Sequence, residues 1–172
     1  MTNLDNVILK EPDITDMDQI YMMGADVWGK DQQKNEYLNE CKNSIKYKSG
    51  QWFALYSENK LLSSLLVHRF DSHGDFNLCG LGSIATNLNY RNKGYGSLII
   101  KKTVEFLSCT ENVNIIFLYS DIDASFYENL GFIRIPKNLQ KYDDSDCMAW
   151  VGSDLSLNNF LDDFDDFIPS YF

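Results

Sequence analysis

Arg91-Asn92-Lys93-Gly94-Tyr95-Gly96-Ser97 is a basic turn with two glycines, and it separates a strand-like run from an apolar helical run. Residues 78–86 are short and apolar with polar flanks, as in a buried strand, whereas the apolar residues after Ser97 recur at roughly helical spacing. The turn is therefore predicted to lie at a helix N-terminus, where unpaired N–H groups and the helix dipole favour an anion. Two glycines permit close approach, and the Arg91 and Lys93 side chains are expected to add mobile positive charge. The pattern predicts a phosphate-binding loop.

Two other kinds of glycine-rich loop are disfavoured by spacing and context. A P-loop needs Gly-x-x-x-x-Gly-Lys-Ser/Thr, which the sequence does not contain. Residues 80–85 match the dinucleotide pattern Gly-x-Gly-x-x-Ala, but a loop at Asn87–Tyr90 follows them where the dinucleotide motif opens a helix.

The loop resembles the pyrophosphate loop of the Gcn5-related N-acetyltransferase (GNAT) family, Arg/Gln-x-x-Gly-x-Gly/Ala, at Arg91, Gly94 and Gly96. A second segment, residues 126–132, contains Tyr-Glu-Asn-Leu-Gly-Phe and resembles the family's Tyr-Glu-x-Leu-Gly-Phe. The order of elements over residues 7–152 is also similar to that of the family. The resemblance implies an α/β (α+β) fold: a single domain whose mixed, mostly antiparallel sheet of six to seven strands has helices on both faces.

The residues themselves predict a matching series of elements. The expected strands are 7–10, 51–57, 61–70, 76–86, 114–119, 132–135 and 146–151. A first helix is expected to begin after a cap at Thr15, a second to span 31–48, a third to follow Ser97 and a fourth to span 124–130. Glu58-Asn59-Lys60 predicts a hairpin turn, and Gly131 predicts a left-handed helix end.

The expected domain covers residues 1–152, and an acidic, Phe-rich segment at 153–172 follows it. Leu157, Phe160, Leu161, Phe164 and Ile168 have helical spacing, with Asp162, Asp163, Asp165 and Asp166 between them. This segment is predicted to be an amphipathic helix that packs on the domain or on a partner subunit.

The family resemblance also implies a coenzyme, acetyl-CoA, and a set of residues that bind it. Backbone groups of the strand end pair with the pantetheine arm, and the amides from Asn92 to Ser97 hold the pyrophosphate. Ser120 and Asp121 stand near the position where many members have an asparagine that contacts the coenzyme. The expected binding residues are Ile84, Ala85, Thr86, Arg91, Asn92, Lys93, Gly94, Tyr95, Gly96, Ser97, Ser120 and Asp121.

Tyr127 matches the family's tyrosine and is the predicted general acid for the coenzyme A thiolate, because a phenol with a pKa near 10 is protonated at neutral pH. The alternative is that Tyr127 only packs beside the coenzyme or hydrogen-bonds its sulfur.

No carboxylate in the sequence is well placed as a general base. A water relayed by Ser120 and Asp121 is the working hypothesis for this role.

The length and net charge of the chain limit the classes of partner that it is expected to bind. The chain has 172 residues, which fits one domain, and 25 acidic against 15 basic residues give a net charge of −10. This excess of acidic residues argues against a nucleic-acid partner and is compatible with a cationic acceptor, although it would equally serve solubility.

The sequence has two histidines and four scattered cysteines, so no metal site is expected. No signal peptide or membrane span is recognisable, which predicts a cytoplasmic protein, and the Phe-rich tail is compatible with a homodimer.

The sequence therefore predicts an acetyl-CoA-dependent N-acetyltransferase in which a primary amine, expected to belong to a small molecule, attacks the thioester directly. Two alternatives stay open. One is acetylation of a protein or peptide amine, and the other is a non-catalytic acyl-CoA-binding or regulatory module.

Overall fold

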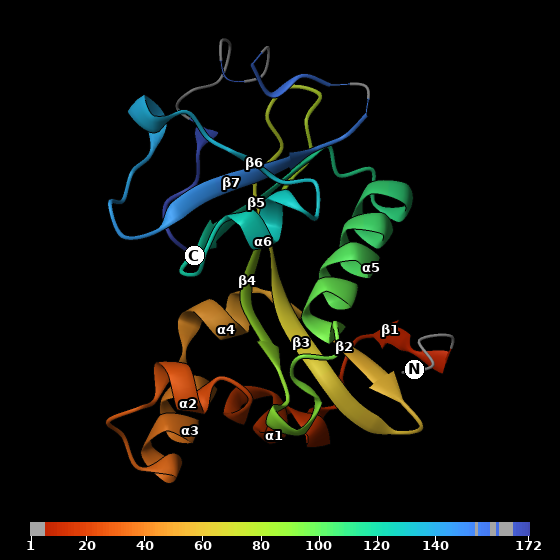
Figure 1. The fold of residues 1–172 in the computed structure, drawn as a ribbon, viewed down its shortest axis with the longest axis vertical. Coiled ribbons are helices and arrows are strands. Elements are labelled where there is room, and N and C mark those ends of the chain that lie inside the picture. Colours follow the sequence, from red (N-terminus) through yellow and green to blue (C-terminus); the bar gives the residue numbers. More distant parts are fainter. Residues whose placement is uncertain (1–5, 154, 159–160, 162–166) are drawn as a thin grey trace. The chain divides into compact units, whose positions relative to one another are not determined.

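The computed structural model describes residues 6–153, 155–158, 161 and 167–172, and Figure 1 shows its strands and helices. The strands are β1 (Ile8–Lys10), β2 (Gln51–Ser57), β3 (Lys60–Arg69), β4 (Leu78–Thr86), β5 (Ile115–Ser120), β6 (Ile133–Arg134) and β7 (Asp146–Val151). The helices are α1 (Met17–Met22), α2 (Ala25–Trp28), α3 (Lys34–Asn43), α4 (Ile45–Ser49), α5 (Tyr95–Thr110) and α6 (Ser125–Glu128).

One seven-stranded sheet has the strand order β1-β2-β3-β4-β5-β7-β6. Strands β4 and β5 are parallel, whereas the pairs β1–β2, β2–β3, β5–β7 and β6–β7 are antiparallel. A parallel pair needs a crossover connection, and α5 lies in the chain between β4 and β5. The prediction of a single domain with a mixed, mostly antiparallel sheet is confirmed.

Within the domain the chain forms two compact units. Unit 1 contains Met1–Val67 and Ser83–Thr103, and unit 2 contains His68–Gly82 and Val104–Phe172. Strands β3 and β4 and helix α5 therefore each contribute to both units. One buried cluster in unit 1 contains Ile20, Met23, Trp52, Ala54, Tyr56, Leu61 and Leu66. One buried cluster in unit 2 contains Leu78, Ile115, Phe117, Ile135, Cys147, Ala149, Leu157, Leu161 and Ile168.

The hairpin between β2 and β3 is confirmed, with a shorter turn than expected. Ser57 pairs with Lys60, so Lys60 belongs to β3 and only Glu58 and Asn59 form the turn. Both turn residues have positive φ, 49° and 64°, as in the two-residue turns that match the twist of a hairpin.

Two helix predictions were wrong in detail. The helix expected over 31–48 is interrupted at Ser44, whose ψ of 122° is extended and whose Oγ accepts the amide of Tyr47 at the start of α4. Thr15 does not cap α1, because it lies inside a 3₁₀ turn at Ile14–Asp16. Asp16 stands at the N-terminus of α1 instead, but its carboxylate accepts the Tyr56 hydroxyl at 2.7 Å and makes no capping bond.

Several expected elements are shorter than predicted. Strand β4 begins at Leu78 because the backbone of Phe76 pairs with His73 across the preceding turn. Helix α6 is a single turn, and it ends before Gly131, whose φ of +90° is the left-handed conformation that was expected there.

The predicted amphipathic helix at 153–172 is only partly described. Phe160, Phe164 and the acidic residues Asp162, Asp163, Asp165 and Asp166 lie outside the described residues. Leu157, Leu161 and Ile168 are buried in the core of unit 2. The boundary at residue 152 stays a prediction. Among the described residues, no helix is long and apolar enough to cross a membrane.

Candidate functional site

The 91–97 loop has the backbone geometry of an anion cradle. Asn92 and Gly94 have positive φ values of 60° and 82°, and the loop leads directly into α5. The amide of Leu98 bonds to the carbonyl oxygen of Gly94 at 2.9 Å, so the amides of Tyr95, Gly96 and Ser97 belong to the first turn of α5, where N–H groups have no partner within the helix. A Cβ atom at Gly94 would have no atom within 4 Å, so the backbone there is open to a ligand. The loop therefore fits a phosphate group at a helix N-terminus.

The side chains of the loop play a different part from the one expected. Tyr95 is buried, and Lys93 bends back so that its Nζ donates to the Asn89 carbonyl at 3.3 Å and lies 5.4 Å from the Tyr90 ring centre. The loop therefore presents backbone amides, and not long basic side chains, to an anion.

Arg91 does not supply mobile charge, which corrects the sequence-based expectation. Its guanidinium forms a bidentate pair with the Asp26 carboxylate at 2.7 and 2.8 Å, and it also donates to the carbonyls of Thr86 and Met23. This pairing lowers the pKa of Asp26, chiefly through the hydrogen bonds from Arg91. Arg91 thus connects α2, the end of β4 and the loop within unit 1. Sequence reasoning missed Asp26, because no motif links it to a loop 65 positions away.

We expect Asp26→Asn to lower the free energy of unfolding by about 1 kcal/mol near neutral pH, the upper end for an ion pair with solvent access. Because the pKa of Asp26 is lowered in the folded state, the pair stabilises above the ordinary carboxyl pKa, and this contribution is lost as the pH falls through the folded-state pKa. Urea unfolding of both proteins near pH 7 and near pH 3 measures this, with Asp13→Asn as a control on an exposed pair with Lys10. An equal loss at both pH values would contradict the assignment.

The end of β4 is held by polar contacts from β3. Ser63 Oγ donates to the Ala85 carbonyl at 2.8 Å and lies 3.2 Å from Thr86 Oγ1. Ser83 has a positive φ of 48°, so the strand departs from regular extended geometry just before Ile84. Ile84, Ala85 and Thr86 are half-buried, which leaves this strand end partly accessible.

Tyr127 is buried in unit 2, on the single turn α6. Its ring packs edge-on against Phe126 and Phe132, with ring centres 5.0 and 6.2 Å away, and its carbonyl accepts the Phe132 amide. Burial, with a smaller contribution from the negative charge of Asp121, raises the pKa of Tyr127 to about 12. The phenol therefore keeps its proton across the neutral range.

Ser120 and Asp121 follow Tyr119 at the end of β5, and their side chains are both engaged. Ser120 is buried and donates its hydroxyl to the Ile122 carbonyl at 2.7 Å. Asp121 accepts the Ser145 hydroxyl at 2.9 Å and the Tyr171 hydroxyl at 2.7 Å. The Ser120 proton is thus committed to the backbone, whereas the exposed Asp121 carboxylate keeps further acceptor capacity.

The predicted residues divide between the two units. Unit 1 holds Ile84–Thr86 and the 91–97 loop, and unit 2 holds Ser120, Asp121 and Tyr127. The structure brings the members of each set together within their own unit.

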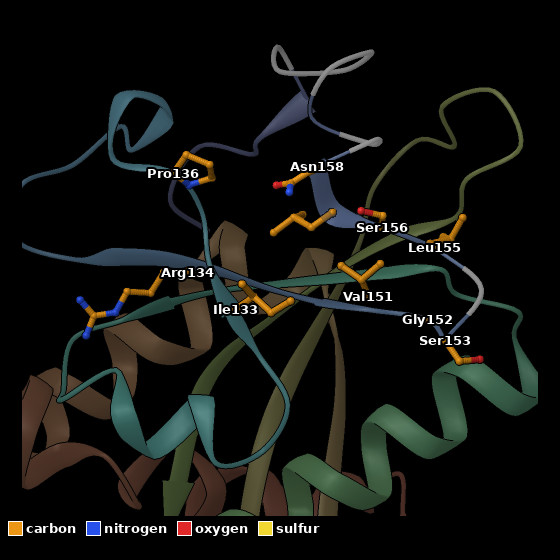
Figure 2. A pocket seen from close by; sticks show the side chains of 10 residues that line it. Ile133, Arg134, Pro136, Val151, Gly152, Ser153, Leu155, Ser156 and Asn158 are labelled. Atoms are coloured by element: carbon orange, nitrogen blue, oxygen red, sulfur yellow. The ribbon is translucent and has the colours of Figure 1, made fainter.

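A cavity of about 450 Å³ lies beside β6, the edge strand of the sheet in unit 2. Its walls come from β6, Pro136, the end of β7, Gly152, Ser153 and residues 155–158. Figure 2 shows Ile133 and Val151 on the wall, with Arg134 extending to one side. Arg134 is paired with Glu128 and Asp146. Because none of the predicted site residues lines it, this cavity is not the candidate site.

In the part of the chain that the structure describes, no group of three or more His, Cys, Asp or Glu side chains could hold a metal ion.

Residues 14–132 match the model of the acetyltransferase (GNAT) family. No curated protein matches the chain. Among solved structures, a variant of the spermidine N-acetyltransferase SpeG from Vibrio cholerae is similar at 13% identity and a TM-score of 0.65, over 90% of this chain and 99% of that chain. A dodecameric structure of spermidine N-acetyltransferase from Vibrio cholerae has 13% identity and a TM-score of 0.59, over 86% and 94% of the two chains. An acetyltransferase from Streptococcus agalactiae has 18% identity and a TM-score of 0.60, over 87% and 100%. At these identities the structural likeness shows the fold.

Proposed function

Because the chain belongs to the acetyltransferase (GNAT) family, we propose that it moves the acetyl group of acetyl-CoA to a primary amine of a small molecule. The prediction of an acetyltransferase enzyme is confirmed by the family match. The observation that supports the rest of the proposal most strongly is the 91–97 loop, which combines left-handed Gly94, open space above it and the N-terminus of a 16-residue helix.

Each group of residues has a proposed task. The amides from Asn92 to Ser97 hold the pyrophosphate, and Arg91 fixes the loop through Asp26 instead of meeting the phosphate with its side chain. Backbone groups of Ile84, Ala85 and Thr86 orient the pantetheine arm. Acetyl-CoA supplies an activated acetyl thioester. Tyr127 holds a proton on its Oη, and it donates this proton to the departing thiolate.

The acceptor must lose a proton to attack, and Asp121 is the proposed contact for the water that carries it away. Ser120 is the weaker half of the expected relay, since its hydroxyl donates to the Ile122 carbonyl. The Asp121 carboxylate already accepts two hydroxyl groups and can accept a water as well.

Small cationic amines are the proposed acceptors. The net charge of −10 attracts cations over long range, and the Vibrio cholerae structures with the same fold are named as spermidine N-acetyltransferases. A protein or peptide amine is the second choice within the same chemistry. A cytoplasmic location and a homodimer stay predictions.

Thiol release from acetyl-CoA, measured against a panel of amines, tests the proposal. The panel should contain spermidine, n-butylamine, free amino acids, an aminoglycoside and a short peptide. We expect release that depends on the acceptor, with small cationic amines giving the highest kcat/KM. Release with the peptide alone would move the function to protein acetylation. No release with any amine, together with a rise in Tm on adding acetyl-CoA, would leave a coenzyme-binding module.

A further inference from the structure

Residues Ile168–Phe172 pack within unit 2, and Phe172 lies against strand β4. The Phe172 ring occupies the space beside Gly80: a Cβ atom there would come within 2.4 Å of the Phe172 ring and 2.9 Å of the Phe70 ring. The Phe172 ring also packs against Tyr119 and His68, with ring centres 5.8 and 5.4 Å away. Glycine at position 80 is therefore what permits this segment to dock.

Polar contacts hold the same segment along its length. Lys141 Nζ donates to the Ile168 carbonyl, and the Tyr119 hydroxyl donates to the Pro169 carbonyl at 2.5 Å. The Tyr171 amide donates to the Tyr142 hydroxyl at 3.2 Å. The docked position is thus specified by several separate bonds in addition to the Phe172 ring.

Docking assembles a tyrosine cluster, Tyr119, Tyr142 and Tyr171, beside a carboxylate. The three ring centres lie 5.1 to 6.0 Å apart, and the Tyr171 hydroxyl donates to Asp121 Oδ2 at 2.7 Å. Tyr142 and Tyr171 are 41% and 46% exposed, and Asp121 is exposed too. Accessible aromatic faces next to a carboxylate are the chemistry that binds an organic ammonium ion.

The cluster is also electrostatically coupled to the proposed acid. The charge of Asp121 contributes to raising the pKa of Tyr127, so the carboxylate that Tyr171 holds is near enough to act on that phenol. A cation at the cluster would therefore lie in the same part of unit 2 as the residue that handles the leaving group.

We propose that the tyrosine cluster and Asp121, assembled by the docked segment Ile168–Phe172, bind a second, non-reacting ammonium group of the acceptor. The inference rests on the proposed function, and it narrows the substrate class to amines with at least two positive charges. Residues 168–172 and Tyr142 lie beyond the part of the chain that matches the family model, whereas Tyr119 and Asp121 lie within it.

The test compares a diamine-type acceptor with a monoamine in three variants. Tyr171→Phe removes the hydroxyl bond to Asp121 but keeps the ring, and Gly80→Ala displaces Phe172. Gly152→Ala is the control, because a methyl group there meets its nearest neighbours at 3.5 Å or more. The quantity measured is the ratio of kcat/KM for spermidine to kcat/KM for n-butylamine, in which effects on the chemical step cancel. Titration of spermidine into the protein saturated with coenzyme A is the second readout.

We expect Tyr171→Phe and Gly80→Ala to lower the ratio at least about fivefold and to weaken spermidine binding, while Gly152→Ala stays within about twofold. An unchanged ratio in Tyr171→Phe would overturn the inference even where Gly80→Ala fails to fold. If the unaltered protein acetylates no amine, the proposed function fails, and the spermidine titration alone tests the cation site. Weaker spermidine binding by Tyr171→Phe than by the unaltered protein supports the site, and equal or absent binding overturns it.

Discussion

Replacing Tyr127 by Phe is expected to lower kcat for amine acetylation about 100-fold, with KM for acetyl-CoA changed less than about twofold. Phe keeps the ring that packs between Phe126 and Phe132, so the loss isolates the hydroxyl group. A general acid contributes in the transition state, where the thiolate forms, and not when the coenzyme binds. Steady-state kinetics with the best amine of the panel measures both constants.

The pH dependence of the unaltered enzyme gives a second test of the same role. Since burial raises the pKa of Tyr127 to about 12, the donating form persists up to about pH 10, and loss of the Tyr127 proton should not lower kcat in that range. The rate should instead rise with pH as the acceptor ammonium loses its proton. A fall in kcat below about pH 9 that disappears in Tyr127→Phe would show that the phenol titrates far lower than its burial implies.

Tyr37→Phe is the matched control, because it removes another buried tyrosine hydroxyl in unit 1, outside the proposed site. We expect its kcat to stay within about twofold of the unaltered value. If Tyr127→Phe behaves like Tyr37→Phe, Tyr127 only packs beside the coenzyme, which is the alternative that the sequence left open.

The features of the candidate site that depend on residues close together in the sequence were predictable. The spacing of the 91–97 loop predicted that Gly94 permits close approach of a ligand, and its left-handed backbone just before α5 is open. Gly131 has the left-handed conformation that was predicted after α6. Both features depend on a glycine and the element next to it. The break at Ser44 was also readable in principle, since a serine inside a helical run is a good N-cap.

Contacts between distant segments were not predictable. The neutralisation of Arg91 depends on Asp26, and the docking of Phe172 depends on Gly80, and neither pair leaves a periodic signal in the sequence. In the sequence, Gly80 stood out only as the first glycine of a false dinucleotide motif, whereas the structure shows that it makes room for an aromatic ring. Local motifs therefore located the loop and the proposed acid, but not the long-range contacts of Arg91 and Phe172.

Gly94→Val should raise the KM for acetyl-CoA and the Kd for coenzyme A by about 30-fold or more. The φ of +82° at this position is strongly disfavoured for a β-branched residue, which would strain the loop. The side chain would also occupy the open space above the loop, where the pyrophosphate is proposed to approach the backbone. Calorimetric titration of coenzyme A measures the Kd without requiring turnover.

Gly74→Val separates these two causes. Gly74 also has a positive φ, +55°, and a Cβ atom there would likewise have no atom within 4 Å, but it lies in the turn before β4 and not in the loop. We expect both variants to lose about 1–2 kcal/mol of unfolding free energy from backbone strain, and only Gly94→Val to lose coenzyme affinity. If the two variants bind coenzyme A equally well, the 91–97 loop is not the phosphate site. A selective loss in Gly94→Val would instead assign the anion to the backbone amides before α5, because Arg91 is already paired and Lys93 is bent back onto Asn89.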